Sequence, residues 1–277
     1  MTAPADAARG PTAAGDSADE SALLAVENLV KQFGGITAVD GATFDVAPGT
    51  LTGLIGPNGA GKSTTFDLIT GVQTPDAGRV VFDGADVTGL SPDRLATRGL
   101  VRTFQIAREL DEMTVMENVM LAPRGQRGER LWRAVTPGAR GDVVAQEREL
   151  RERAWEMLDF FDLDHLAGAD AGTLSGGQRK LLEMARVLMT DPTMVLLDEP
   201  LAGVNPTLSE RLLERVNDLR EQGYTFLLVE RDMDVVMSHC DPIVVLHQGR
   251  VLVEGSPAAV RADERVVEAY LGGEVEG

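Results

Sequence analysis

The chain has 277 residues, of which 43% are hydrophobic and 25% are charged, a composition typical of a soluble globular protein with a buried core. Its formal net charge of −18 argues against general nucleic-acid binding, because an acidic surface repels a polyanion. A single cysteine, Cys240, excludes an intrachain disulfide and a cysteine-based zinc site, and no run of 18 apolar residues is present to cross a membrane.

The basic residues are unevenly divided between the two types. Lysine occurs only at Lys31, Lys62 and Lys180, and arginine supplies the rest. An acidic, lysine-poor composition of this halophilic type suits a salt-rich cytoplasm, where counterions screen the surface charge. A codon bias toward arginine, alanine and aspartate explains the same composition equally well.

Residues 1–22 are rich in Ala, Asp, Gly and Ser, and we expect them to form a disordered tail. They lack the basic start and apolar run of a secretory signal. Residues 23–277 are expected to form the folded domain.

The first part of this domain predicts four strands and several helix starts. A helix should begin near Gly61, and another at Ser91–Pro92, where a serine N-cap precedes a proline. Thr114 and Glu117 have the spacing of a capping box. The predicted strands are 23–30, 42–47, 51–55 and 80–82, and residues 100–104 are also strand-like.

Residues 123–153 differ in character because they are rich in arginine, with prolines and glycines early on. We expect a loop that runs into a helix at about 142–161. A solvated, salt-bridged surface is the favoured interpretation of this segment, and a contact with a partner chain is the alternative.

After residue 174, predicted helices and strands alternate. The helices are 178–189, 206–222 and 232–239, and the strands are 194–197, 225–229 and 243–246. This alternation predicts an α/β fold with a mostly parallel sheet and helices on both faces. No internal repeat is visible, so the chain contains one such unit.

Residues 56–64 match the phosphate-binding loop pattern G-x-x-x-x-G-K-[ST], between an apolar strand and a predicted helix. Backbone amides and the helix N-terminus would surround the phosphates, with Lys62 on the β- and γ-phosphates and Ser63 on Mg²⁺. The candidate nucleotide-binding residues here are Gly56, Pro57, Asn58, Gly59, Ala60, Gly61, Lys62, Ser63 and Thr64.

Two adjacent carboxylates, Asp198 and Glu199, follow the apolar strand that begins at Met194. Asp198 at the strand end can hold Mg²⁺ through water, and Glu199 can act as the general base that polarises an attacking water. The solvated end of a strand is the alternative, which the phosphate-binding loop makes weak.

The segment Leu174-Ser175-Gly176-Gly177-Gln178 precedes a helix and suits the binding of a γ-phosphate. With this segment between the P-loop and the acidic pair, residues 23–272 resemble the ABC ATPase family, whose signature is L-S-G-G-Q.

The resemblance implies a P-loop ATPase core with a mostly parallel sheet, an antiparallel β-subdomain, and a helical subdomain inserted at about 107–174. It also implies ATP and Mg²⁺ as ligands. Two ATPase subunits would meet head to tail, as a heterodimer or a homodimer, so that Ser175 and Gly177 serve the partner's nucleotide. Integral-membrane permease subunits would be direct partners at the cytoplasmic face of the cell membrane, and a substrate-binding protein only an indirect one.

Two further roles follow from the resemblance. Phe33 stands where an aromatic ring stacks on adenine, and a core phenylalanine is an equally good interpretation. Gln105 matches a glutamine that contacts Mg²⁺ and couples the ATPase to the membrane subunits.

One position departs from the family pattern. Arg231 follows Glu230 where the family usually has a histidine on the γ-phosphate. Arginine can bond phosphate oxygens but cannot accept a proton. We therefore expect an altered, slower site, with a better one formed by a non-identical partner.

Several segments resemble the ATPases of branched-chain amino acid importers, with urea and amide importers as relatives of similar pattern. These segments are Phe33-Gly34-Gly35, Met113-Thr114-Val115, Leu201-Ala202-Gly203-Val204-Asn205-Pro206 and Val267-Glu268-Ala269-Tyr270-Leu271-Gly272. The alternatives are a soluble ABC ATPase of the cluster-assembly type and a regulatory subunit disabled by Arg231. The intact Lys62, Asp198 and Glu199 argue against the second alternative.

Overall fold

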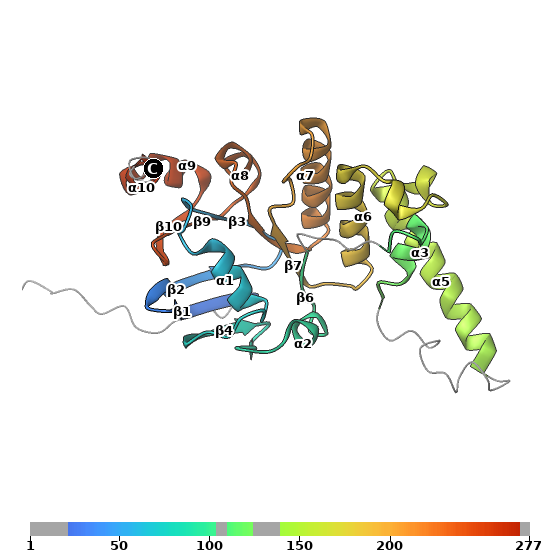
Figure 1. The fold of residues 1–277 in the computed structure, drawn as a ribbon, viewed down its shortest axis with the longest axis horizontal. Helices are drawn as coiled ribbons and strands as arrows, with labels where there is room; N and C mark the ends of the chain where they lie inside the picture. The colour runs from blue at the N-terminus through green and yellow to red at the C-terminus, as the bar shows by residue number, and fades with distance from the viewer. Residues whose placement is uncertain (1–21, 104–109, 124–138, 272–277) are drawn as a thin grey trace, which may run out of the picture.

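The computed structural model describes residues 22–103, 110–123 and 139–271, with side chains from 144 in the last range (Figure 1). The tail expected at 1–22 lies outside these residues except for its last position, and so does Gln105. Among the described residues, no helix has both the length and the apolar character needed to cross a bilayer.

A six-stranded sheet forms the centre of the fold, with strand order β10-β9-β3-β8-β7-β6. The five strands from β9 to β6 are parallel, and β10 is antiparallel to β9. This arrangement confirms the mostly parallel sheet. The strands are β3 (Leu51–Ile55), β6 (Leu100–Arg102), β7 (Met194–Asp198), β8 (Thr225–Val229), β9 (Ile243–His247) and β10 (Arg250–Gly255).

A second, antiparallel sheet has the order β2-β1-β4-β5, as the antiparallel β-subdomain of the resemblance implied. The predicted strand at 42–47 is only the second half of β2, because a Gly34–Gly35 turn starts that strand earlier. The strands are β1 (Leu24–Phe33), β2 (Ile36–Val46), β4 (Ala77–Phe82) and β5 (Ala85–Asp86).

The helices up to residue 239 follow the predicted order, whereas the two at Pro257–Ala262 and Glu264–Leu271 were not predicted. Ser91 and Thr114, the two predicted N-cap residues, both have the extended backbone of an N-cap. Thr114 and Glu117 form a reciprocal capping box, and Ser91 is the extended N-cap before Pro92. The α-helices are α1 (Lys62–Ile69), α2 (Pro92–Ala96), α3 (Val115–Met120), α5 (Ala139–Phe160), α6 (Gly176–Leu188), α7 (Pro206–Glu221), α8 (Met233–His239), α9 (Pro257–Ala262) and α10 (Glu264–Leu271).

Between α3 and α6, short 3-10 turns at Asp164–Leu166 and Ala171–Thr173 complete a helical region beside the central sheet. Helix α5 extends away from the rest of the molecule (Figure 1). The helix begins three residues before the predicted 142.

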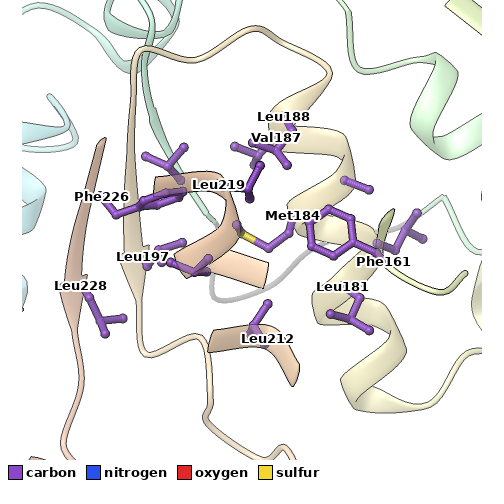
Figure 2. Packing of buried hydrophobic residues seen from close by; sticks show 14 of the residues in the cluster. Phe161, Leu181, Met184, Val187, Leu188, Leu197, Leu212, Leu219, Phe226 and Leu228 are labelled. Carbon is purple, nitrogen blue, oxygen red and sulfur yellow. The ribbon is translucent and has the colours of Figure 1, made fainter. Parts of the chain in front are cut away.

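A hydrophobic core joins the central sheet to this helical region. Leu197 and Phe226 of the sheet lie beside Leu219 of α7, while Met184 of α6 lies beside Phe161 of the helical region (Figure 2). All of these side chains are buried. Because β3, β8 and β7 are adjacent and parallel, their carboxyl ends lie together at one edge of the sheet.

Candidate active site

The P-loop connects the carboxyl end of β3 to the start of α1. Lys62 bends back over this loop and donates hydrogen bonds from Nζ to the carbonyl oxygens of Gly56 at 2.6 Å and Pro57 at 3.1 Å. The N-terminal amides of α1 and the Lys62 ammonium are therefore concentrated at one place, which is the arrangement that binds phosphate.

Two glycines allow the loop to pack closely on its surroundings. Gly61 has φ of 98°, and a β-carbon there would lie 2.4 Å from the carbonyl oxygen of Ala38. A β-carbon on Gly56 would lie 2.2 Å from the carbonyl oxygen of Leu246. Larger residues at these positions would displace the loop backbone.

A cavity of about 270 Å³ brings the P-loop together with two residues from other strand ends. Glu199 follows β7 and Arg231 lies beyond β8, and the cavity joins them to the loop because β7 and β8 are adjacent in the sheet. Its lining comprises Ala38, Asn58, Gly59, Ala60, Gly61, Lys62, Ser63, Thr64, Glu199 and Arg231.

The electrostatics of this cavity favour an anion. Burial lowers the pKa of Lys62, the nearby charge of Arg231 lowers it further, and Glu199 acts in the opposite direction. The positive side chains of Lys62 and Arg231 face the single carboxylate of Glu199, which leaves an excess of positive charge in the cavity. A bound polyphosphate would neutralise this excess.

Glu199 is held in an uncommon conformation. Its φ of 44° lies in the left-handed region, and its backbone amide donates to the carbonyl oxygen of Val229 at 2.9 Å. The side chain is 14% exposed and accepts a hydrogen bond from Arg231 Nε at 2.7 Å. A non-glycine residue with this backbone is frequent at functional sites.

Glu230 supports both of the segments that carry these residues. Its carboxylate accepts from the backbone amide of Leu201 at 2.9 Å and from that of Arg231 at 3.2 Å. Burial raises the pKa of Glu230, although these two amide hydrogen bonds act to lower it. The sequence reasoning missed this residue, which ties the turn after Glu199 to the turn at Arg231.

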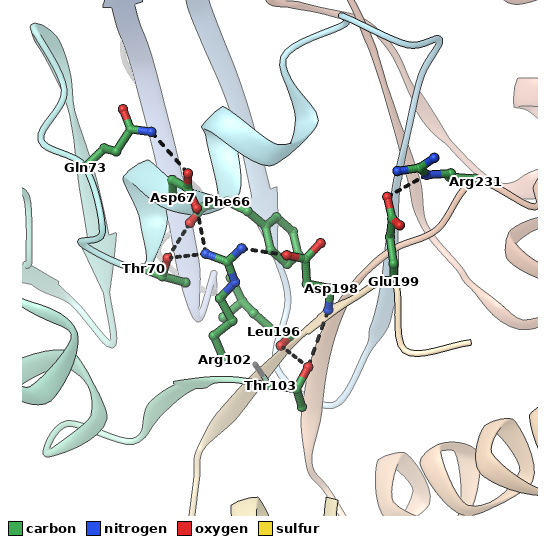
Figure 3. Close-up of polar contacts among 10 residues, drawn as sticks. All are labelled: Phe66, Asp67, Thr70, Gln73, Arg102, Thr103, Leu196, Asp198, Glu199 and Arg231. Atoms are coloured by element: carbon green, nitrogen blue, oxygen red, sulfur yellow. Dashed lines mark hydrogen bonds and ion pairs between the residues drawn. The ribbon is translucent and has the colours of Figure 1, made fainter. Parts of the chain in front are cut away.

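Asp198 lies at the end of β7, and its side chain is 4% exposed. One of its oxygens, Oδ2, accepts a hydrogen bond from Arg102 Nη2 at 2.5 Å, and the other points away from that guanidinium (Figure 3). Arg102 also donates to Asp67 of α1 at 2.7 Å. Arg102 and Asp67 were not predicted as site residues; an arginine at the end of an apolar strand was the available signal.

Asp198 and Ser63 carry oxygens of the kind that binds Mg²⁺. Among residues 22–103, 110–123 and 144–270, no group of three or more His, Cys, Asp and Glu side chains could hold a metal by itself. Mg²⁺ is commonly held by one or two protein oxygens together with substrate phosphates. Asp198, with one oxygen directed away from Arg102, and the Ser63 hydroxyl at the first turn of α1 provide such oxygens.

The Leu174–Gln178 segment lies apart from this cavity. Ser175 caps α6 in a capping box with Gln178, with the two bonds at 3.3 Å and 2.9 Å. None of the described residues that line the P-loop cavity comes from this segment. Its members Ser175, Gly176, Gly177 and Gln178 therefore stand at the start of α6, separate from the chain's own P-loop.

Phe33 lies at the end of β1 and is 44% exposed, with Lys31 Nζ 5.5 Å from the centre of its ring. This exposure excludes the core interpretation of Phe33. The Gln105 prediction falls outside the described residues.

Comparison with known proteins identifies the family. The sequence model described as ABC transporter matches residues 39–202, and that described as branched-chain amino acid ATP-binding cassette transporter matches residues 250–276. A probable branched-chain amino acid transport ATP-binding protein, LivG of Archaeoglobus fulgidus, is 42% identical over 250 residues, covering 90% of this chain and 95% of the relative. The high-affinity branched-chain amino acid transport ATP-binding protein BraF of Pseudomonas aeruginosa is 40% identical, covering 90% of this chain and 98% of the relative.

Solved structures agree with this assignment. A nucleotide-free ATP-binding cassette from an ABC transporter aligns with a TM-score of 0.76 and 39% identity, covering 90% of this chain and 98% of that one. An ATP-binding cassette of an ABC transporter in its ADP conformation aligns with the same TM-score and identity, covering 91% of this chain and 99% of that one. This chain therefore belongs to the ABC transporter family, as one of its ATP-binding cassettes.

Proposed function

We propose that this chain binds and hydrolyses ATP to energise an importer of branched-chain amino acids. The observation that carries the proposal is the single cavity that joins the P-loop to Glu199 and Arg231. Its support from relatives is the 42% identity to a protein named for branched-chain amino acid transport.

In this function Glu199 acts as the general base on the attacking water. Its carboxylate lies at the edge of the cavity and faces the P-loop from the end of β7. Lys62 and the first amides of α1 hold the phosphates, and Arg231 supplies a further donor to their oxygens. Phe33, exposed at the end of β1, is available to stack on the adenine ring.

Ser63 and Asp198 would hold Mg²⁺, and we retain Gln105 as a third proposed ligand. The cation would neutralise charge on the β- and γ-phosphates. The protein's contribution is to keep the Ser63 hydroxyl and one Asp198 oxygen available to it.

The segment Ser175–Gln178 would act on the nucleotide of a second ATPase subunit, because it stands apart from the chain's own P-loop. We propose that ATP closes the two subunits head to tail and that closure moves the helical subdomain at about 107–174 against the permeases. The altered Arg231 position favours a non-identical partner, that is, a heterodimer.

The relatives favour the importer over the two alternatives. Both named relatives are transport ATP-binding proteins, and they align over nearly their whole length. Such a subunit would work as a peripheral protein on the cytoplasmic face of the membrane, together with permease subunits. The P-loop, Asp198 and Glu199 are intact, which argues against a subunit limited to regulation.

The test is affinity purification of the tagged protein from detergent-solubilised membranes at high salt, with identification of the co-purifying chains. We expect multi-spanning permeases and a second ATPase chain. Recovery of permeases without a second ATPase chain would favour a homodimer. Recovery of only soluble proteins would overturn the importer proposal while leaving the ATPase proposal standing.

The recovered complex can then be placed in liposomes that enclose ATP, so that complexes with the ATPase face inward are energised, and uptake of leucine, urea and a short amide is compared. Leucine uptake is expected to dominate. Complexes carrying Glu199→Gln serve as the control and should bind ATP but neither hydrolyse it nor drive uptake. Equal activity of that variant would refute the role of Glu199.

A further inference from the structure

Arg102, at the last position of β6, reaches two carboxylates that belong to different parts of the fold. Its side chain is only 17% exposed. Nη1 donates to Asp67 Oδ1 at 2.7 Å and Nη2 donates to Asp198 Oδ2 at 2.5 Å (Figure 3). One guanidinium thus bridges α1 and the end of β7.

The contact with α1 is made by several groups. Asp67 follows Ser63 by four residues, so the two lie one helical turn apart on the same face. Asp67 Oδ2 also accepts from Gln73 Nε2 at 3.1 Å, and Arg102 Nη1 lies 3.4 Å from Thr70 Oγ1. The Arg102 guanidinium carbon is 5.9 Å from the centre of the Phe66 ring. These contacts hold the guanidinium against the helix that begins with the P-loop lysine.

The contact with Asp198 leaves one carboxylate oxygen available. Oδ2 is engaged by Arg102, while the other oxygen points away from it (Figure 3). The Asp198 backbone amide is 3.5 Å from Thr103 Oγ1, which lies 3.4 Å from the Leu196 carbonyl oxygen. Both the side chain and the backbone of Asp198 are thereby tied to the end of β6.

The charge of Arg102 persists in this half-buried position. Burial acts to lower its pKa, but the hydrogen bonds to Asp67 and Asp198 outweigh burial and raise it. Two carboxylates share one guanidinium, so a net negative charge remains beside the place where a cation is needed. A buried carboxylate without such a partner would be costly.

We propose that Arg102 is a positioning residue for the divalent cation that accompanies ATP. It braces α1 against the end of β7, so that Ser63 and the available oxygen of Asp198 keep one spacing. This inference rests on the proposed function, in which Ser63 and Asp198 hold that cation.

Arg102→Lys tests the idea because lysine keeps the charge but cannot bond both carboxylates through a planar fork. The measurement is a titration of the intact protein with Mn²⁺ in the presence of a non-hydrolysable ATP analogue, followed by electron paramagnetic resonance. We expect Mn²⁺ affinity to fall about 10- to 100-fold, the usual effect of losing an outer-shell partner. Affinity for the analogue in EDTA should stay within about twofold of wild type, because the P-loop contacts are retained.

Two further variants separate positioning from folding. Asp67→Asn removes one anchor of Arg102 without touching Asp198, and should weaken Mn²⁺ binding in the same direction by a smaller factor. Arg79→Lys is the control for the replacement itself, because Arg79 also pairs with a carboxylate, that of Glu27 in the other sheet, at 2.6 Å, although it is more exposed than Arg102. This variant should bind Mn²⁺ as wild type does, and thermal unfolding confirms that all three variants are folded.

Unchanged Mn²⁺ affinity in both Arg102→Lys and Asp67→Asn would overturn the proposal. Tighter Mn²⁺ binding would overturn it too, since Arg102 would then compete with the cation. Asp198→Asn distinguishes this failure from that of the proposed function. If Asp198→Asn leaves Mn²⁺ affinity intact, the assigned role of Asp198 fails; if it weakens binding while Arg102→Lys does not, only the role of Arg102 fails.

Discussion

Arg231 and Glu199 form an ion pair at the mouth of the P-loop cavity, with Arg231 Nε 2.7 Å from Glu199 Oε1. Arg231 is 71% exposed, whereas Glu199 is 14% exposed. The hydrogen bond to Glu199 raises the pKa of Arg231, so the guanidinium stays charged. The carboxylate proposed as general base is therefore engaged by the residue that replaces the expected histidine.

Replacing this arginine should accelerate hydrolysis. A carboxylate oxygen that accepts a hydrogen bond from a guanidinium is less available to an attacking water, and histidine at this position would release it. We expect Arg231→His to raise kcat by a factor of about 2 to 10, a modest gain because the Arg231 end of the pair is exposed and solvent screens it. Steady-state phosphate release at saturating ATP measures the effect.

The salt dependence of the Arg231–Glu199 pair provides an internal control for the predicted rate increase in Arg231→His. Because salt screens an exposed ion pair, the difference between wild type and Arg231→His should narrow as ionic strength rises. Unchanged or lower turnover in the variant at all salt concentrations would show that Arg231 does not restrain Glu199.

Local motifs in the sequence were sufficient to predict most of the site. The P-loop, the Asp198–Glu199 pair and the Leu174–Gln178 segment are each contiguous, so their proposed chemistry is visible in a few neighbouring residues. The contacts of Arg102 with Asp67 and Asp198 join residues 35 and 96 positions apart, and that of Arg231 with Glu199 spans 32. Such contacts depend on strand order, which the pattern of strands and helices leaves open.

The same limit applied to the fold. The buried strands and amphipathic helices were predicted closely because their hydrophobic periods are clear. The first half of β2 and all of β10 were missed, since both contain many half-exposed or exposed residues and lack a strong alternation. The short strand β5 and the C-terminal helices α9 and α10 were not predicted either.

Removal of the Phe33 ring should weaken nucleotide binding. The ring is exposed at the end of β1, where it is available for stacking on a base. Stacking on an aromatic side chain contributes about 1–3 kcal/mol per base, so Phe33→Ala should weaken ATP binding about 5- to 150-fold. Isothermal titration with Mg²⁺-ATP measures this loss.

Ile36→Ala is the control for this variant, because Ile36 lies across the same hairpin and is 73% exposed. It should bind ATP as wild type does. Equal affinities for Phe33→Ala and wild type would mean that the adenine lies elsewhere.

Cys240 should resist thiol reagents in the folded protein. Burial, with a smaller contribution from the charge of Glu230, raises the pKa of the Cys240 thiol from 9.0 to about 12. At pH 8 the reactive thiolate is therefore suppressed, and a thiol reagent such as DTNB should react only as the protein unfolds. A full equivalent of rapid reaction under native conditions would contradict this burial.

The same group predicts a loss of stability at alkaline pH. Between pH 9 and about 12 the unfolded state gives up the Cys240 proton while the folded state retains it. The unfolded state thus binds fewer protons, and the free energy of unfolding falls as pH rises through this window. In Cys240→Ala, the free energy of unfolding, measured by urea denaturation, should fall less between pH 9 and pH 11 than it does in the wild type.

Adjacent glycines at the start of α6 should respond in opposite ways to the same substitution. A β-carbon on Gly177 would lie 1.9 Å from Leu208 Cδ2 and 3.0 Å from its Cγ, whereas one on Gly176 would meet nothing within 4 Å. Gly177→Ala should therefore lower the free energy of unfolding by about 1–2 kcal/mol through overpacking against α7. Gly176→Ala should leave it unchanged or raise it by less than about 1 kcal/mol, because alanine favours helix.

Chemical denaturation of both variants, and of each combined with Leu208→Ala, tests this difference. If the clash with Leu208 is the cause, the loss from Gly177→Ala should largely disappear in the Leu208→Ala background, because the side chain it meets is then absent. The effect of Gly176→Ala should be the same in both backgrounds. Additive effects of Gly177→Ala and Leu208→Ala would mean that Gly177 is required for a reason other than the close approach of α6 to α7.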